Sequence, residues 1–88
     1  MQRKAGFEIV DVSNEYMAIP VGEMARDYKG IVVLSEPAAF LLRHMDAQTT
    51  ESELCMLLQQ EYEVDSSVAV ADVKRIIATF YDIGLIER

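Results

Sequence analysis

The first third of the chain consists of short apolar segments separated by turn residues. Residues 7–13 (FEIVDVS) and 16–21 (YMAIPV) are rich in β-branched and aromatic side chains, which favour strands. The polar segment 22–30 begins and ends with glycine and is predicted to be a loop. Residues 31–34 (IVVL) form a third predicted strand. Consecutive strands with short connections favour an antiparallel meander.

The rest of the chain repeats apolar residues at the spacing of helices. Stripes at i, i+3, i+4 and i+7 predict three helices, the last of them over residues 66–83. Ser35 is a suitable N-cap for the first helix, and Thr50 with Glu53 fits a capping box at the start of the second. Gly84 suits the left-handed C-cap of the third. The residues expected in the core are Leu41, Leu54, Leu58, Val73, Ile76 and Phe80, with Leu85 and Ile86 folding back onto it.

This order of elements, βββααα, predicts an α+β fold: a three-stranded antiparallel sheet followed by three helices, similar to a winged helix-turn-helix. The length of 88 residues fits one domain, residues 1–88. Hydrophobic residues make up 51% of the chain and charged residues 26%, a balance typical of globular proteins. No apolar run approaches the length of a membrane span, so we expect no membrane partner, and the single cysteine fits a reduced, cytoplasmic protein.

The net charge of −7 narrows the range of partners. An acidic domain is a poor candidate for binding the phosphate backbone of nucleic acid. A winged-helix regulator would need basic residues on its recognition helix, whereas residues 66–83 offer only Lys74 and Arg75. We therefore expect no nucleic-acid partner, although a winged-helix DNA-binding regulator stays open as an alternative function.

The chain offers few side chains for catalysis. His44 and Cys55 are its single histidine and single cysteine, and such a pair could act as base and nucleophile. Both lie among apolar positions of predicted helices, where packing or surface roles are more common. The glycines are spaced as turn residues rather than as a phosphate-binding loop. We expect neither an enzyme nor a metal or cofactor site.

Two apolar features indicate a binding surface instead. The predicted strand 31–34 has no polar alternation, so both of its faces are apolar, and either helices cover them or another molecule docks there. On the predicted helix 66–83, four residues at i, i+4, i+7 and i+11 form a flank beside the core stripe. This flank is either part of a broad core-facing stripe or one wall of a groove. Its residues are Val70, Lys74, Ile77 and Tyr81.

Three segments of the sequence resemble the PqqD-like family in their order and spacing. They are the runs GIVVLSEPAAFLLRHM, TTESELCMLLQQEYEVD and DVKRIIATFYDIGLIE. The first is similar to the family's pattern of a glycine, an apolar strand ending in leucine, and small and apolar helix positions. The second resembles the family's second helix, and the third resembles its last helix and final glycine. The resemblance extends from about Phe7 to Glu87.

The resemblance implies a RiPP recognition element, a domain that binds the leader of a ribosomally made precursor peptide. In that family the leader adds a strand beside the third strand, in a groove closed by the third helix. The domain presents the peptide to a modifying enzyme, often a radical S-adenosylmethionine enzyme, and itself catalyses nothing. The peptide-binding residues implied here are Ile31, Val32, Val33, Leu34, Val70, Lys74, Ile77 and Tyr81. A dimerisation module, in which the strand edge pairs with a second copy to give a homodimer, is a further alternative.

Overall fold

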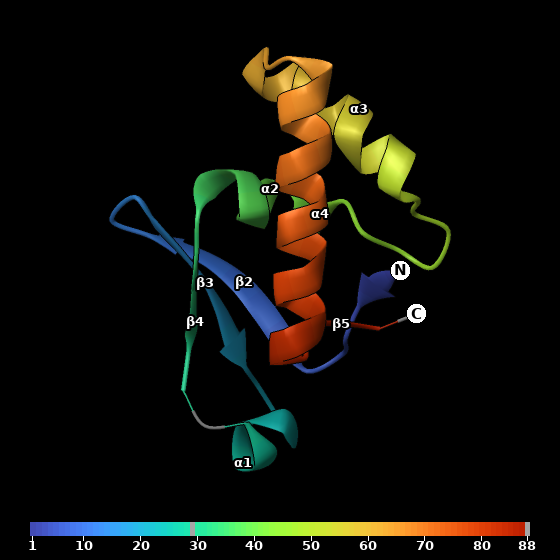
Figure 1. The fold of residues 1–88 in the computed structure, drawn as a ribbon. Coiled ribbons are helices and arrows are strands. Elements are labelled where there is room, and N and C mark those ends of the chain that lie inside the picture. The colour runs from blue at the N-terminus through green and yellow to red at the C-terminus, as the bar shows by residue number, and fades with distance from the viewer. Residues whose placement is uncertain (29, 88) are drawn as a thin grey trace.

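The computed structural model describes residues 1–28 and 30–87 and contains a three-stranded antiparallel sheet (Figure 1). Strand β2 (Phe7–Val12) pairs with β3 (Glu15–Pro20), which pairs with β4 (Val32–Leu34). Ser13 and Asn14 join β2 to β3 with φ angles of 53° and 66°, as in a two-residue type I′ hairpin turn. The predicted meander is confirmed, and each strand ends within one residue of its predicted limits.

A second, smaller sheet joins the two ends of the described chain. Strand β1 (Gln2–Arg3) pairs antiparallel with β5 (Ile86–Glu87), and the Lys4 N–H donates to the Leu85 carbonyl at 2.8 Å. Neither strand is predicted from the sequence, because two residues are too few to show an alternating pattern. The pairing holds Leu85 and Ile86 against the core, where both are buried as predicted.

The segment 22–30, predicted to be a loop, contains a short helix, α1 (Met24–Asp27). A single helical turn carries no apolar repeat, so the sequence pattern does not reveal it. The helix lies close to Gly6, where a Cβ atom would be 2.8 Å from the Met24 Cβ. Gly6 also has a φ of 98°, so the close approach and the backbone conformation both favour glycine. Lys29, in the predicted loop, lies outside the described residues.

Three longer helices follow β4 at the predicted positions: α2 (Glu36–Arg43), α3 (Glu51–Tyr62) and α4 (Ser66–Ile83). Helix α3 packs against α4, and α2 contacts both α3 and strand β3 (Figure 1). The predicted α+β fold, with strands followed by helices, is confirmed. Within the described residues, no helix combines the length and the apolar character needed to cross a membrane.

The helix boundaries follow from their caps. The Ser35 Oγ accepts a hydrogen bond from the Ala38 N–H at 3.2 Å, which starts α2. The Thr50 Oγ1 accepts from the Glu53 N–H at 3.2 Å, and the Thr50 hydroxyl donates to the Glu53 carboxylate at the same distance. The Thr50 half of the predicted capping box is therefore present, whereas the Glu53 carboxylate accepts from the Thr50 hydroxyl and not from its backbone N–H. Gly84, with a φ of 78°, ends α4 in the left-handed conformation.

The core lies between the helices and the inner face of the main sheet. All six residues predicted to form it are buried, with exposed fractions of 5% or less: Leu41, Leu54, Leu58, Val73, Ile76 and Phe80. From the sheet, Ala18 and Leu34 point into the same core. Because side chains alternate along a strand, Met17 and Val33, which are in register on β3 and β4, point to the opposite, outer face.

Candidate functional site

Strand β4 forms one edge of the main sheet. In the order β2-β3-β4, β4 pairs with β3 on one side, and no strand of the described residues pairs with it on the other. An unpaired edge offers backbone N–H and C=O groups to an incoming strand, and folded proteins normally protect such edges. The free edge of β4 is therefore a candidate binding surface.

The hairpin between β2 and β3 determines which backbone groups bond across the sheet. In a two-residue hairpin, the pair that flanks the turn is hydrogen-bonded, which here is Val12 with Glu15. From that pair onward, hydrogen-bonded and non-hydrogen-bonded pairs alternate along an antiparallel ladder. The bond from the Val21 N–H to the Gly6 carbonyl, at 2.8 Å, agrees with this alternation.

The same alternation determines the direction of the backbone of β4. Met17 is in a hydrogen-bonded pair with Val10 of β2, so its backbone groups face away from β4. Its partner on β4, Val33, is therefore in a non-hydrogen-bonded pair, whereas Val32 and Leu34 bond to β3. It follows that the N–H and C=O of Val33 point to the open edge of the sheet.

The side chains of the predicted strand 31–34 lie in two environments. Leu34 is buried and Val32 is half-buried on the inner face, whereas Val33 on the outer face is 71% exposed. Ile31, which precedes β4 rather than belonging to it, is also exposed. Both faces of the strand are apolar, as predicted, but the described helices cover only the inner one.

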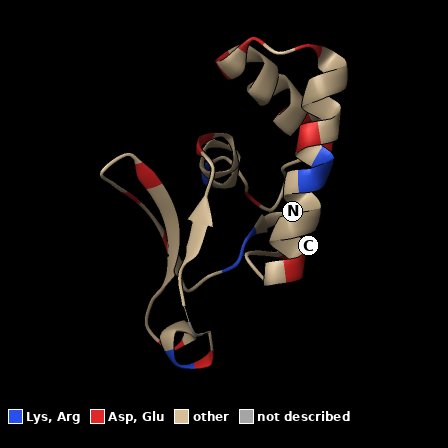
Figure 2. Ribbon diagram, turned by 60° about the vertical axis from the view of Figure 1, so that its left-hand side comes forward, with Lys and Arg blue, Asp and Glu red and all other residues tan. Residues whose placement is uncertain are grey.

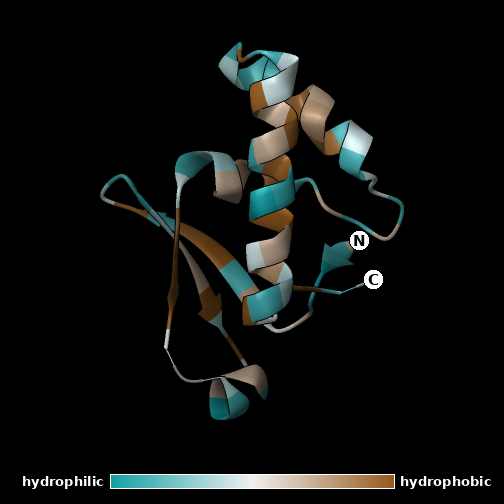
Figure 3. Cartoon of the chain, viewed as in Figure 1, coloured by the Kyte–Doolittle hydropathy of each residue, from teal (hydrophilic) through white to brown (hydrophobic). Residues whose placement is uncertain are grey.

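A groove of about 150 Å³ lies between β4 and α4. The buried side chains of Ile76 and Phe80 form its floor. On the strand side it is lined by β4 itself, and at the start of α2 by Ser35 and Ala38. Figure 3 shows apolar colouring along β4 and in bands down α4. The open edge and an apolar groove are therefore adjacent.

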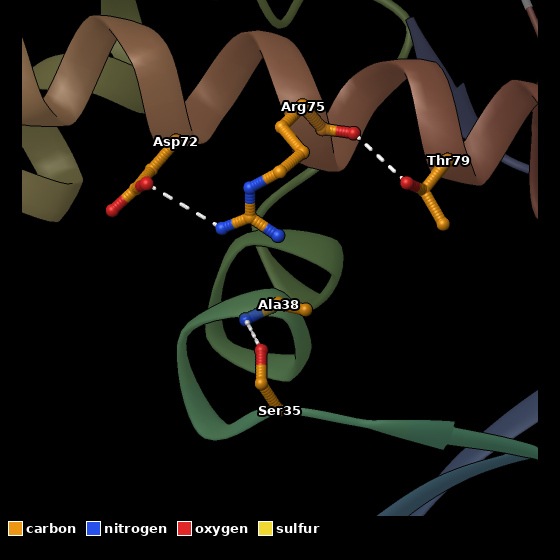
Figure 4. A network of polar contacts seen from close by, with 5 residues as sticks. All are labelled: Ser35, Ala38, Asp72, Arg75 and Thr79. Atoms are coloured by element: carbon orange, nitrogen blue, oxygen red, sulfur yellow. Dashed lines mark hydrogen bonds and ion pairs between the residues drawn. The ribbon is translucent and has the colours of Figure 1, made fainter.

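The end of the groove next to α2 is polar. Arg75 points from α4 towards the first turn of α2, which Ser35 caps (Figure 4). The Arg75 Nη2 lies 3.4 Å from the Asp72 Oδ1, and the Thr79 hydroxyl donates to the Arg75 carbonyl at 3.0 Å. The groove thus combines an apolar floor with one cationic end.

The predicted helical wall lies on a different face of α4. Val70 and Lys74 line a separate cleft with α3, while Ile77 and Tyr81 are half-buried and pack against the core. At about 100° per residue, this line of four residues lies nearly half a turn around α4 from the residues that line the groove. The expectation that it faces β4 is therefore wrong. Peptide binding on this line stays a prediction, as the alternative to binding in the groove beside β4, and Val70 and Lys74 serve to distinguish the two surfaces.

The α4 residues that do face β4 flank the other side of the core stripe. Arg75, Thr79 and Ile83 recur at i, i+4 and i+8 and line the groove together with its apolar floor. Arg75 and Thr79 are polar, so the sequence pattern assigns them to the solvent side. The sequence signal that could have identified this side of the groove is the four-residue spacing of Arg75, Thr79 and Ile83, which ends in an apolar residue.

The cleft between α3 and α4 holds the cysteine of the chain. Burial raises the pKa of the Cys55 thiol, the nearby Glu51 carboxylate raises it further, and Lys74 acts in the opposite direction. His44 lies elsewhere, with its Nδ1 2.8 Å from the Phe40 carbonyl. A thiol with a raised pKa is a poor nucleophile. Among the described residues, no group of His, Cys, Asp and Glu side chains is arranged to hold a metal ion.

The two cations of α4, Lys74 and Arg75, are adjacent in the sequence, and Asp72 comes two residues before Lys74. Figure 2 shows this basic segment of α4 close to an acidic one. Lys74 pairs with Glu51 at 3.7 Å and Arg75 with Asp72 at 3.4 Å. Because the net charge is −7 and α4 carries only these two cations, we expect no tight binding of duplex DNA in a gel-shift titration at low salt, where electrostatic binding is strongest. Tight, salt-sensitive retardation of the DNA would instead favour the regulator function.

Comparison with known proteins supports the fold and the family. No curated protein matches the sequence. The solved structure of TbiB1 in complex with the TbiA(beta) leader peptide is similar in fold, with a TM-score of 0.74 and 13% identity over 99% of this chain and 95% of the TbiB1 chain. The family model for coenzyme PQQ synthesis protein D (PqqD) matches residues 23–86, which include β4, α4 and the groove between them. Because this match spans most of the chain, the resemblance seen in the sequence is confirmed, and the protein belongs to the PqqD family.

Proposed function

We propose that the protein binds the leader segment of a ribosomally made precursor peptide as an added strand on β4. The observation that carries this proposal is the open edge of β4, where the backbone of Val33 points outward beside an apolar groove. Strand addition takes its affinity from backbone hydrogen bonds and its specificity from side-chain pockets. The open edge of β4 and the groove lie side by side, so one extended peptide can bond to the edge and place its side chains in the groove.

The wider role of the domain follows from this mode of binding. The similarity in fold to TbiB1, whose solved structure is a complex with a leader peptide, supports the proposal, as does membership of the PqqD family. We infer that the chain acts as one domain over residues 1–88 in the cytoplasm and presents the peptide to a modifying enzyme without catalysing a reaction itself. A radical S-adenosylmethionine enzyme is one candidate for that partner. Pairing of the same edge with a second copy, the homodimer alternative, stays a prediction.

Methyl NMR distinguishes the β4–α4 groove from the α3–α4 cleft. The probe is the tightest-binding peptide selected by the protein from a library of random dodecapeptides. We expect its titration to shift the methyl signals of Val33, Ile76 and Ile83, which line the groove. The signals of Met56 and Val70, which line the α3–α4 cleft, serve as the internal control and should stay unchanged. Shifts confined to those two residues would contradict strand addition at β4.

A further inference from the structure

Arg75 provides the charged side chain that lines the β4–α4 groove within the described residues. The protein as a whole has a net charge of −7, so the groove carries a charge of opposite sign to that of the whole protein. Arg75 lies at the α2 end, whereas Ile83 lies further along α4 at the other end, with Ile76 and Phe80 between them. A peptide strand that fills the groove therefore meets two ends of different chemistry.

The contact between Arg75 and Asp72 leaves most of the guanidinium available to a ligand. The two side chains are 70% and 41% exposed and lie 3.4 Å apart, and an exposed pair of this kind contributes little to stability. A guanidinium has five N–H donors in a planar fork, and this contact is its one hydrogen bond to a described residue. A second carboxylate can therefore bind the fork without displacing Asp72.

The other polar groups at this end of the groove already have partners. The Ser35 Oγ accepts from the Ala38 N–H, and the Thr79 hydroxyl donates to the Arg75 carbonyl (Figure 4). Asp72 could attract a basic side chain, but it is not among the described residues that line the groove, whereas Arg75 is. The α2 end of the groove therefore favours an acidic ligand side chain over a basic one.

The length of the groove along α4 determines the spacing of the ligand side chains. From Arg75 to Ile83 the helix rises about 12 Å, at about 1.5 Å per residue. In an added strand, every second side chain points to the same face, at intervals of about 6.7 Å. About three inward side chains therefore span the groove, the first at Arg75 and the others about two and four residues away.

We propose that the protein selects peptides in which an Asp or Glu side chain binds Arg75 and apolar side chains two and four residues away fill the rest of the groove. This inference rests on the proposed function, to which it adds the chemical class of the peptide and the residue that recognises it. Acidic residues outnumber basic ones in the protein, so a ligand carboxylate is repelled in general and attracted at Arg75. That contrast fixes the register of the bound peptide.

The test is selection from a display library of random dodecapeptides by the wild-type protein, by Arg75→Glu and by the matched control Lys74→Glu. The two substitutions change the net charge equally and lie next to each other on α4, but Lys74 lines the α3–α4 cleft. We expect the wild type and Lys74→Glu to enrich an acidic residue at one fixed position, with apolar residues two and four positions away from it. Arg75→Glu should enrich Lys or Arg at that position.

Dissociation constants of individual selected peptides test the role of Arg75 directly. A peptide selected by the wild type should bind Arg75→Glu at least about tenfold more weakly, and exchange of its acidic residue for lysine should restore the binding. Circular dichroism checks that each variant is folded. If Arg75→Glu does not fold because of the new carboxylate beside Asp72, Arg75→Gln removes the charge without adding one, and the same tenfold loss is expected.

The outcomes separate this inference from the proposed function. Selected peptides that lack a fixed acidic position and bind the Arg75 variants as tightly as the wild type would overturn the inference and leave strand addition intact. If the wild type enriches no peptide, or if its selected peptides bind Val33→Pro with full affinity, the proposed function fails and the inference fails with it.

Discussion

Replacement of Val33 by proline is expected to remove most of the affinity for a bound peptide while the domain stays folded. The Val33 N–H points to the open edge, so proline removes a donor that an added strand would use and places its ring in the path of that strand. The Val33 side chain is largely exposed, so little core packing is lost. An unmade hydrogen bond of this kind costs about 1–3 kcal/mol, or roughly 5- to 150-fold in Kd.

Asp11→Pro is the matched control for this substitution. Asp11 lies on β2, the opposite edge of the sheet, and by the same alternation its N–H also points outward. Isothermal titration calorimetry of both variants, with a peptide selected by the wild type, compares the two edges. An equal loss in both variants would indicate general damage to the sheet, and full affinity in both would place the peptide away from β4.

Phe80→Ala is expected to lower the free energy of unfolding by about 3–5 kcal/mol, the range for truncation of a buried phenylalanine. Phe80 is 2% exposed, and it contributes to both the core and the floor of the groove. Small domains have total stabilities of about 5–15 kcal/mol, so this variant is expected to be close to unfolding. Urea denaturation followed by circular dichroism measures the change.

Met56→Ala provides the comparison for Phe80→Ala. Met56 lies on α3 and is 59% exposed, so its truncation should change the free energy of unfolding by no more than about 0.5 kcal/mol. A loss below about 1 kcal/mol for Phe80→Ala, similar to that of a surface change, would show that the Phe80 ring is not packed in the core as the structure has it.

The longer helices and strands were predictable because their signals are local. Ser35 and Thr50 cap helices through groups three residues away, and Gly84 ends α4 through its own backbone conformation. The strands β1 and β5 were not predictable, because they exist only through the pairing of Gln2 with Glu87 across the whole chain. Helix α1, a single turn, likewise has too few residues for a periodic pattern.

The candidate site was predictable on its strand side and not on its helix side. Four consecutive apolar residues, 31–34, stand out at the end of the predicted meander. On α4, apolar residues flank the core stripe on both sides, with Val70 and Ile77 on one side and Ile83 on the other. Periodicity gives the angles between residues of one helix, but it does not say which flank faces another element.

By itself, the sequence determined the order of the main elements, the residues of the core and the apolar third strand, because each depends on neighbours along the chain or on a repeating period. Only the tertiary structure decided that Arg75, and not Lys74, lines the groove beside β4. The physical reason is that the rotation of α4 about its axis is set by how Ile76 and Phe80 pack into a core built from distant segments.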